Sequence, residues 1–162
     1  MSRVSEALKV MTVDFERQHG FPPGTNEVRP ADHDDQAAAR LLARAGTAPA
    51  DLITFYGSIG DATWADVGNG YFVAPAADVL LQLAERADVT ASADPRPSGL
   101  VIGSNGGGQS YVVAPGGTVY RTRTASLDEP ELDRMAVDLR QFLELLEQAL
   151  TRFIATNEPG HL

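Results

Sequence analysis

Short β-type runs separated by glycine turns occupy the second half of the chain, and they constrain the fold more than any other feature. The runs are 100–102, 109–113 and 118–124. Asn105-Gly106 lies between the first two, and the run 115–117 (Pro-Gly-Gly) lies between the last two. Turn residues of these types connect neighbouring strands in tight hairpins. The sequence therefore predicts an antiparallel β-meander, with a further short strand at 71–73 after another Asn-Gly turn.

Helical periodicity surrounds this β region. Apolar residues recur at steps of three and four, and the last segment has such a stripe over about seven turns. The predicted helices cover residues 2–19, 32–45, 49–57, 75–87 and 130–156. Asp128 and Glu131 have capping-box spacing at the start of the last one. We expect an α+β fold: an antiparallel β-meander sheet flanked by helices, with a long C-terminal amphipathic helix.

The second predicted helix has the clearest end signals. Asp32, Asp34 and Asp35 lie in its first turn, where free N–H groups and the helix dipole favour negative charge. Gly46 provides the left-handed stop. Residues 20–30, 61–66 and 91–98 are predicted as loops, because they are rich in proline, glycine or polar residues.

The length of 162 residues suits one domain with its own core. We expect an N-terminal extension at 1–30, a single domain at 31–157 and a tail at 158–162. No apolar run resembles a signal peptide or is long enough to cross a bilayer, so the expected location is the cytoplasm.

Charge and cysteine content exclude several classes of protein. Lys and Arg number 13 against 22 Asp and Glu, which gives a net charge of −9. Such an acidic chain is unsuited to binding the phosphate backbone of a nucleic acid. The chain has no cysteine, which excludes disulfides, thiolate catalysis and cysteine-ligated zinc.

Three motifs resemble catalytic or ligand-binding sites, but each lacks the required context. The glycine-rich run 103–108 is followed by a strand rather than the helix that a phosphate loop needs. Ser58 lies in an imperfect nucleophile elbow after a predicted helix, where a strand is required. The run 32–35 contains metal-ligand types, but adjacent helical residues cannot converge on one ion. We therefore predict no cofactor, no metal site and no enzymatic activity, although a pair of carboxylates in a pocket would keep catalysis open.

Acidic residues concentrate in the middle of the chain, with seven acids against two arginines between residues 51 and 98. The segment 61–66 also holds the only tryptophan, Trp64. A tryptophan flanked by acids is typical of a binding hot spot for a basic protein. Asp61, Trp64, Asp66 and Asp94 are thus the candidate partner-binding residues. The alternative is that Trp64 folds back onto the core beneath a solvated acidic loop.

The order of motifs resembles the SUKH superfamily, which groups fungal cell-wall-assembly regulators with bacterial immunity proteins. The run 101–111 is similar to the strand–turn–strand motif of that family, and Thr118-Val119-Tyr120 resembles its following strand. The runs 48–56 and 138–144 resemble its opening and closing helices. The matching motif residues are Gly103, Asn105, Gly106, Gly107, Gly108, Tyr111 and Tyr120, which we interpret as structural.

The resemblance implies an α+β protein without a catalytic set that binds another protein. For bacterial members the expected role is to neutralise a toxin, often a nuclease. The acidic charge fits this expectation, because nucleases need basic surfaces to hold phosphate. The alternative is a regulatory or scaffold protein that binds a host protein or a small ligand, as the fungal members suggest.

Overall fold

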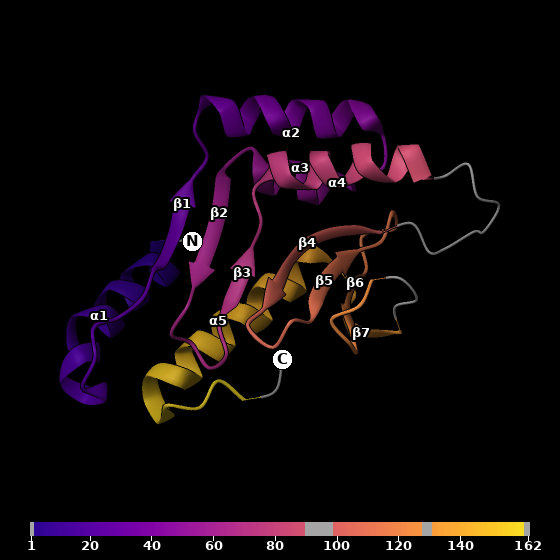
Figure 1. Cartoon of the computed structure of the whole chain (residues 1–162). Helices are drawn as coiled ribbons and strands as arrows, with labels where there is room; N and C mark the ends of the chain where they lie inside the picture. The colour runs from indigo at the N-terminus through magenta and orange to yellow at the C-terminus, as the bar shows by residue number, and fades with distance from the viewer. Residues whose placement is uncertain (1, 90–98, 128–130, 161–162) are drawn as a thin grey trace.

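Seven short strands form one antiparallel sheet whose order follows the chain (Figure 1). The structure is a computed structural model, and it describes residues 2–89, 99–127 and 131–160. The strands are β1 (Asn26–Pro30), β2 (Ile59–Trp64), β3 (Tyr71–Val73), β4 (Leu100–Asn105), β5 (Ser110–Val113), β6 (Val119–Thr122) and β7 (Leu132–Ala136). Every neighbouring pair is antiparallel, so the predicted meander is confirmed and extends to seven strands.

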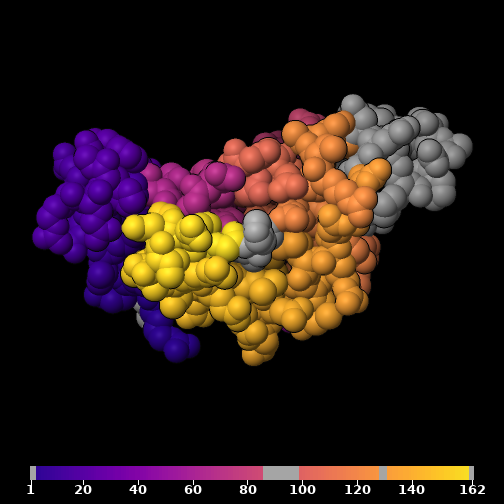
Figure 2. Space-filling model, turned by 90° about the horizontal axis from the view of Figure 1, so that it is seen from below, coloured from indigo at the N-terminus to yellow at the C-terminus, as the bar shows by residue number. Residues whose placement is uncertain are grey.

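Five helices in the described residues pack around this sheet. They are α1 (Ser2–His19), α2 (His33–Ala45), α3 (Ala50–Tyr56), α4 (Ala76–Val89) and α5 (Leu139–Thr156). Helices α2, α3 and α4 lie together at one end of the strands, whereas α5 passes behind the strands (Figure 1). Seen from below, α1 and α5 lie next to each other, and they are in contact (Figure 2). The architecture is therefore α+β, as predicted.

Local sequence signals set the ends of the helices. Asp32 is the N-cap of α2, and its carboxylate accepts hydrogen bonds from the Asp34 and Asp35 backbones. Asp35 completes a capping box with Asp32, and Gly46 ends the helix at a φ of 72°. At α5, the Asp138 carboxylate accepts a hydrogen bond of 2.8 Å from the Gln141 backbone N–H. These caps satisfy N–H groups that have no partner inside a helix.

The core lies between the sheet and α5. The rings of Tyr111 on β5 and Phe142 on α5 have centroids 4.9 Å apart. Both side chains are fully buried, and Leu146 and Leu150 of α5 join them. Phe142, Leu146, Leu150 and Phe153 recur at steps of three and four, so the apolar stripe seen in the sequence faces the sheet.

Two strands occupy segments that we predicted as loops. Asn26–Pro30 forms β1, and Ile59–Trp64 forms β2, which pairs with β1 and β3. Burial alternates along β2, with Ala62 and Trp64 inward and Asp61 and Thr63 less buried. The prediction failed because small residues such as Gly60 and Ala62 have low strand propensity and hide the alternation.

The C-terminal helix is shorter than predicted. Residues 132–136 form strand β7 at the edge of the sheet, and α5 begins only at Leu139. Leu132 and Met135 have a helical spacing, but pairing with β6 places their segment in the sheet. The helix is capped by Asp138 rather than by the predicted box at Asp128, which lies outside the described residues.

The first thirty residues contribute to the same core as the rest of the chain. Val4, Leu8, Met11 and Phe15 are buried on the predicted face of α1. The first three belong to the main hydrophobic cluster, and β1 pairs with β2. The segment that we expected to be an extension thus supplies a helix and an edge strand of the sheet.

This packing predicts that α1 contributes to global stability. Leu8→Ala, at a side chain 1% exposed, should lower the free energy of unfolding by about 2–5 kcal/mol. Val13→Ala on the same helix is the control, since Val13 is 81% exposed and should change it by less than about 0.5 kcal/mol. Urea unfolding followed by circular dichroism measures both. Equal, small effects would mean that α1 is a detachable extension.

Candidate protein-binding site

The predicted partner-binding residues do not form one exposed patch. Asp61 and Trp64 lie three residues apart on β2, so their side chains point to opposite faces of the sheet. Trp64 is only 4% exposed and packs edge-on against Tyr71, with ring centroids 6.4 Å apart. The Trp64 ring is therefore part of the core, and its indole N–H has no hydrogen-bond partner in the described part of the chain.

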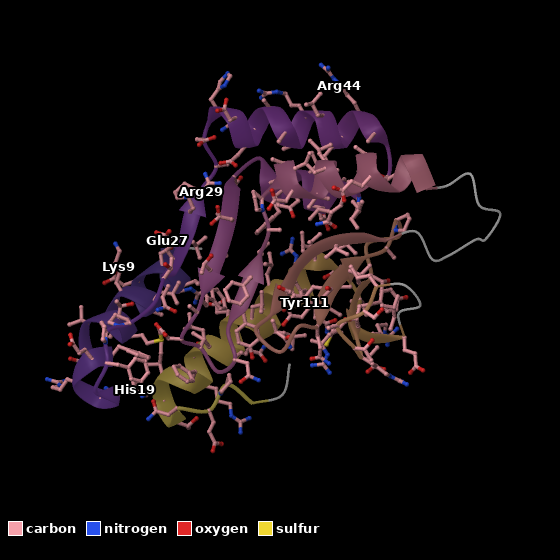
Figure 3. The ribbon with its side chains drawn as sticks, viewed as in Figure 1. Lys9, His19, Glu27, Arg29, Arg44 and Tyr111 are labelled. Atoms are coloured by element: carbon pink, nitrogen blue, oxygen red, sulfur yellow. The ribbon has the colours of Figure 1, made fainter. Side chains whose placement is uncertain are left out.

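Asp61 belongs to an ion-pair network centred on Arg29 of β1 (Figure 3). The Arg29 guanidinium donates to Asp61 at 2.7 Å and to both carboxylate oxygens of Asp35 on α2. Hydrogen bonds from Arg29 and from the Asp32 backbone lower the pKa of Asp35 from 3.8 to about 2. The two carboxylates raise the pKa of Arg29. This network connects β1, β2 and the start of α2, so Asp61 has a role within the fold.

Asp66 is held in a similar way by the loop before β1. Its carboxylate accepts a hydrogen bond of 2.7 Å from the Gly24 backbone and another from the Asn26 side chain. The Asn26 side chain in turn accepts from the Asp66 backbone N–H. Asp94 lies outside the described residues. Charge reversal at Asp61 or Asp66 would therefore disturb contacts within the chain and would not isolate an effect on binding.

The glycine-rich run 103–108 covers the end of β4 and the turn that leads to β5. Asn105 organises this turn, because its side-chain oxygen accepts hydrogen bonds of 3.0 Å from the backbones of Gly107 and Gln109. The left-handed residue is Gly108, at a φ of 82°, and not the Asn105-Gly106 pair that the sequence suggested. The turn is longer than a two-residue hairpin, which moves the positive φ to its end.

Two glycines in this run are required by close approaches of other backbone segments. A Cβ on Gly103 would overlap the carbonyl oxygen of Phe72 on the paired strand β3. A Cβ on Gly106 would overlap the carbonyl oxygen of Asn69, in the β2–β3 connection. Gly106 also donates a backbone hydrogen bond of 3.1 Å to Gly70. Through Gly106, the β4–β5 turn therefore packs directly against the β2–β3 connection.

Tyr111 and Tyr120 lie on opposite faces of the sheet. Tyr111 is buried against α5, and this burial raises the pKa of its hydroxyl. Tyr120 on β6 pairs with Val112 and is half-buried on the other face.

A cleft of about 440 Å³ with a mainly apolar lining lies between α1, α3, α5 and the sheet. Its apolar floor comes from five elements: Val4, Phe55, Ile59, Trp64, Val73 and Leu143. Val4, Ile59, Trp64 and Val73 belong to the buried core, whereas Phe55 and Leu143 are half-buried. The volume is of the size that small ligands or single large side chains of a partner fill.

Acidic side chains border this cleft on two helices. Asp51 lies in the first turn of α3, and Glu144 and Glu147 project from α5. Glu147 approaches Arg3 at 4.0 Å, and Arg140 is the one basic residue among the described residues that line the cleft. Asp51 and Glu144 make no ion pair within the described ranges, and both are exposed. The border therefore carries negative charge, and a partner can contact the exposed carboxylates of Asp51 and Glu144.

Sequence reasoning missed this cleft because its border comes from helices about ninety residues apart. The acid count pointed to the stretch 51–98, but Asp51 is the only acid of that stretch that lines the cleft among the described residues. The cluster Glu144 and Glu147 lies on the polar side of α5, where it resembles an ordinary solvated helix face. Only the packing of α5 beside α3 brings these carboxylates to one border.

The described residues show little of the geometry expected of a nucleophilic, acid–base or metal site. Ser58 lines the cleft, but no histidine of the described residues does. A hydrogen-bonded arginine lowers the pKa of Asp35 and of Asp133, so neither carboxyl group is held protonated as a general acid. In the ranges that the structure describes, no group of three His, Asp or Glu is placed to hold a metal ion. None of the described helices is both long and apolar enough to cross a membrane.

Neither a protein-family model nor a curated protein matches the chain.

The close approach at Gly106 predicts a large loss of stability on substitution. Gly106→Ala should lower the free energy of unfolding by more than about 2 kcal/mol, because backbone atoms on both sides would have to separate. Gly116→Ala in the β5–β6 turn is the matched control. A Cβ there meets nothing within 4 Å, so its effect should stay within about 1 kcal/mol. Chemical denaturation of both variants measures the difference, and equal effects would remove the structural role of Gly106.

The lowered pKa of Asp35 predicts a specific acid dependence of stability. Its stabilising contribution should be complete above about pH 5 and should disappear as pH falls from 4 to 2, because protonation breaks the contact with Arg29. Asp35→Asn should lower the unfolding free energy by about 1–2 kcal/mol at neutral pH, and the difference should shrink toward pH 2.

Glu27→Gln on the same strand as Arg29 is the control, because the Glu27 side chain is exposed and forms no ion pair with Arg29 in the described residues (Figure 3). Urea unfolding at a series of pH values compares the three proteins. A difference between the native chain and Asp35→Asn that does not change with pH would contradict the assignment.

Proposed function

We propose that this chain is a non-catalytic protein-binding domain of the immunity type, which neutralises a nuclease-type toxin by binding it. The observation that carries the proposal is the apolar cleft bordered by Asp51, Glu144 and Glu147 on a molecule of net charge −9. An apolar centre with a charged border is the usual anatomy of a protein interface.

Electrostatics favours a basic partner. A nuclease needs a positive surface to hold phosphate, and an acidic inhibitor is steered toward that surface during association. The free carboxylates on the cleft border are the groups that would meet it, because Asp61 and Asp35 are already paired with Arg29. The inhibitor would then occupy the surface that the nucleic acid needs.

The resemblance of the sequence motifs to the SUKH superfamily points in the same direction. Its motif residues Gly103, Asn105 and Gly106 have roles within the fold here, which fits a family defined by a scaffold rather than by a catalytic set. The proposal places this chain in the cytoplasm.

A second candidate is a regulatory protein that binds a small ligand. The volume of the cleft, about 440 Å³, lies within the range of small-molecule sites, and this observation favours that alternative. The two candidates differ in what occupies the cleft, so identification of the native partner separates them.

Affinity capture with the full chain from its native cytoplasm tests the proposal, with washes at low and at high salt. The expected result is a basic protein that elutes with salt, has nuclease activity and is inhibited by one equivalent of the purified chain. Capture of a partner whose activity the chain leaves unchanged, or of cell-envelope proteins alone, would overturn the immunity role.

The free border carboxylates predict a salt-dependent association. Affinity for the basic partner should fall by about tenfold or more between about 50 and 500 mM salt, since the interaction is screened within a Debye length of about 10 Å or less. The double variant Asp51→Asn/Glu144→Gln should slow association by about tenfold at low salt, and Glu27→Gln, on β1 away from the cleft, should not. Surface plasmon resonance measures the affinity at each salt concentration and the association rate of each variant. Affinity that is independent of salt would contradict the electrostatic part of the proposal.

A further inference from the structure

The cleft combines two recognition elements that select one kind of ligand group. Its floor is apolar and contains Trp64, and its border carries Asp51 and Glu144 without ion pairs in the described ranges. We propose that this cleft binds an apolar side chain of the partner that is directly followed or preceded by a lysine or arginine. The identity of that partner rests on the proposed function, whereas the chemistry of the cleft does not.

The floor accounts for the apolar half of this ligand. This floor includes four buried core residues: Val4 from α1, Ile59 and Trp64 from β2, and Val73 from β3. Phe55 and Leu143 are half-buried at its sides, so part of their apolar surface remains in contact with water. Covering this surface with an apolar or aromatic side chain removes it from water, which is the main source of affinity at interface centres.

The border accounts for the cationic half. Asp51 lies at the N-terminal turn of α3, and Glu144 and Glu147 lie one turn apart on α5. Arg140 partly offsets this negative charge. Arg3 also contacts Glu147, but the distance is 4.0 Å and the Arg3 side chain is 90% exposed. An exposed contact of this kind is weak, so a partner cation can displace Arg3. Carboxylates thus remain in excess where the backbone of a bound segment would leave the cleft.

Trp64 is a built-in reporter of this site. It is the only tryptophan of the chain, and it lines the cleft. Its fluorescence and its indole N–H resonance can therefore be followed in the intact chain without a label. A ligand at another site, such as the exposed apolar surface between α2 and α4 near Leu41 and Leu81, would leave these signals unchanged.

Titration with three small probes of matched size tests the proposal. The probes are 2-phenylethylammonium, neutral 2-phenylethanol and anionic 3-phenylpropionate. We expect 2-phenylethylammonium to shift the Trp64 indole resonance saturably, with a Kd of the order of 1–10 mM, as befits so small a ligand. The neutral probe should bind more weakly, and the anion weakest by about tenfold at low salt.

The double variant Asp51→Asn/Glu144→Gln should abolish the preference for the cation while the neutral probe binds as before. Glu27→Gln should keep the full preference. Equal binding of cation and anion to the native chain, or no shift of the Trp64 resonance up to about 20 mM cation, would overturn the proposal.

These outcomes are independent of the immunity role. If affinity capture yields no toxin but the cleft still prefers the cationic probe, the toxin assignment fails and the ligand chemistry stands. If a toxin is captured and inhibited but the double variant binds it with unchanged affinity and the probes show no preference, the toxin assignment stands and the cleft is not the site.

Discussion

The packing of α5 against one face of the sheet is the interaction on which the rest of the structure depends. The strands are three to six residues long, and such short strands are not stable without a covered apolar face. Phe142 provides the central contact with Tyr111, and further apolar residues of α5 extend it. One helix is too narrow for a seven-stranded sheet, so α1 and α3 cover the part nearest β1 and β2. The cleft lies where these three helices meet, and it is thus a consequence of how the sheet is covered.

A second constraint divides the acidic residues into two groups. Arg29 holds Asp35 and Asp61 at the edge of the sheet, and the Gly24 backbone and Asn26 side chain hold Asp66. These carboxylates stabilise the chain itself. On the cleft border, Asp51 and Glu144 form no ion pair in the described residues. These two carboxylates carry exposed negative charge at the cleft, and a partner interacts most strongly with the exposed charges nearest to it.

The sequence predicted the elements whose signals are local. Helices α1 to α4 and the β4–β6 meander were found within a few residues of their observed bounds, since apolar periodicity, the Asp32 cap and turn glycines act over short distances. The missed strands β1, β2 and β7 depend on pairing partners far along the chain. The partner-binding role of Asp61, Trp64, Asp66 and Asp94 stays a prediction; the structure adds that Trp64 faces the core, which was only the alternative expectation from the sequence.

The sequence by itself determined the helical faces, their caps, the turns and the acidic balance, because each of these depends on neighbours within a few residues. Only the tertiary structure decided which carboxylates are paired and which are free. Pairing of Arg29 with Asp61 joins residues 32 positions apart, and the cleft border joins α3 to α5 across about ninety. Such proximity follows from the register of β1 on β2 and the docking of α5, which are properties of the packed chain and not of any single segment.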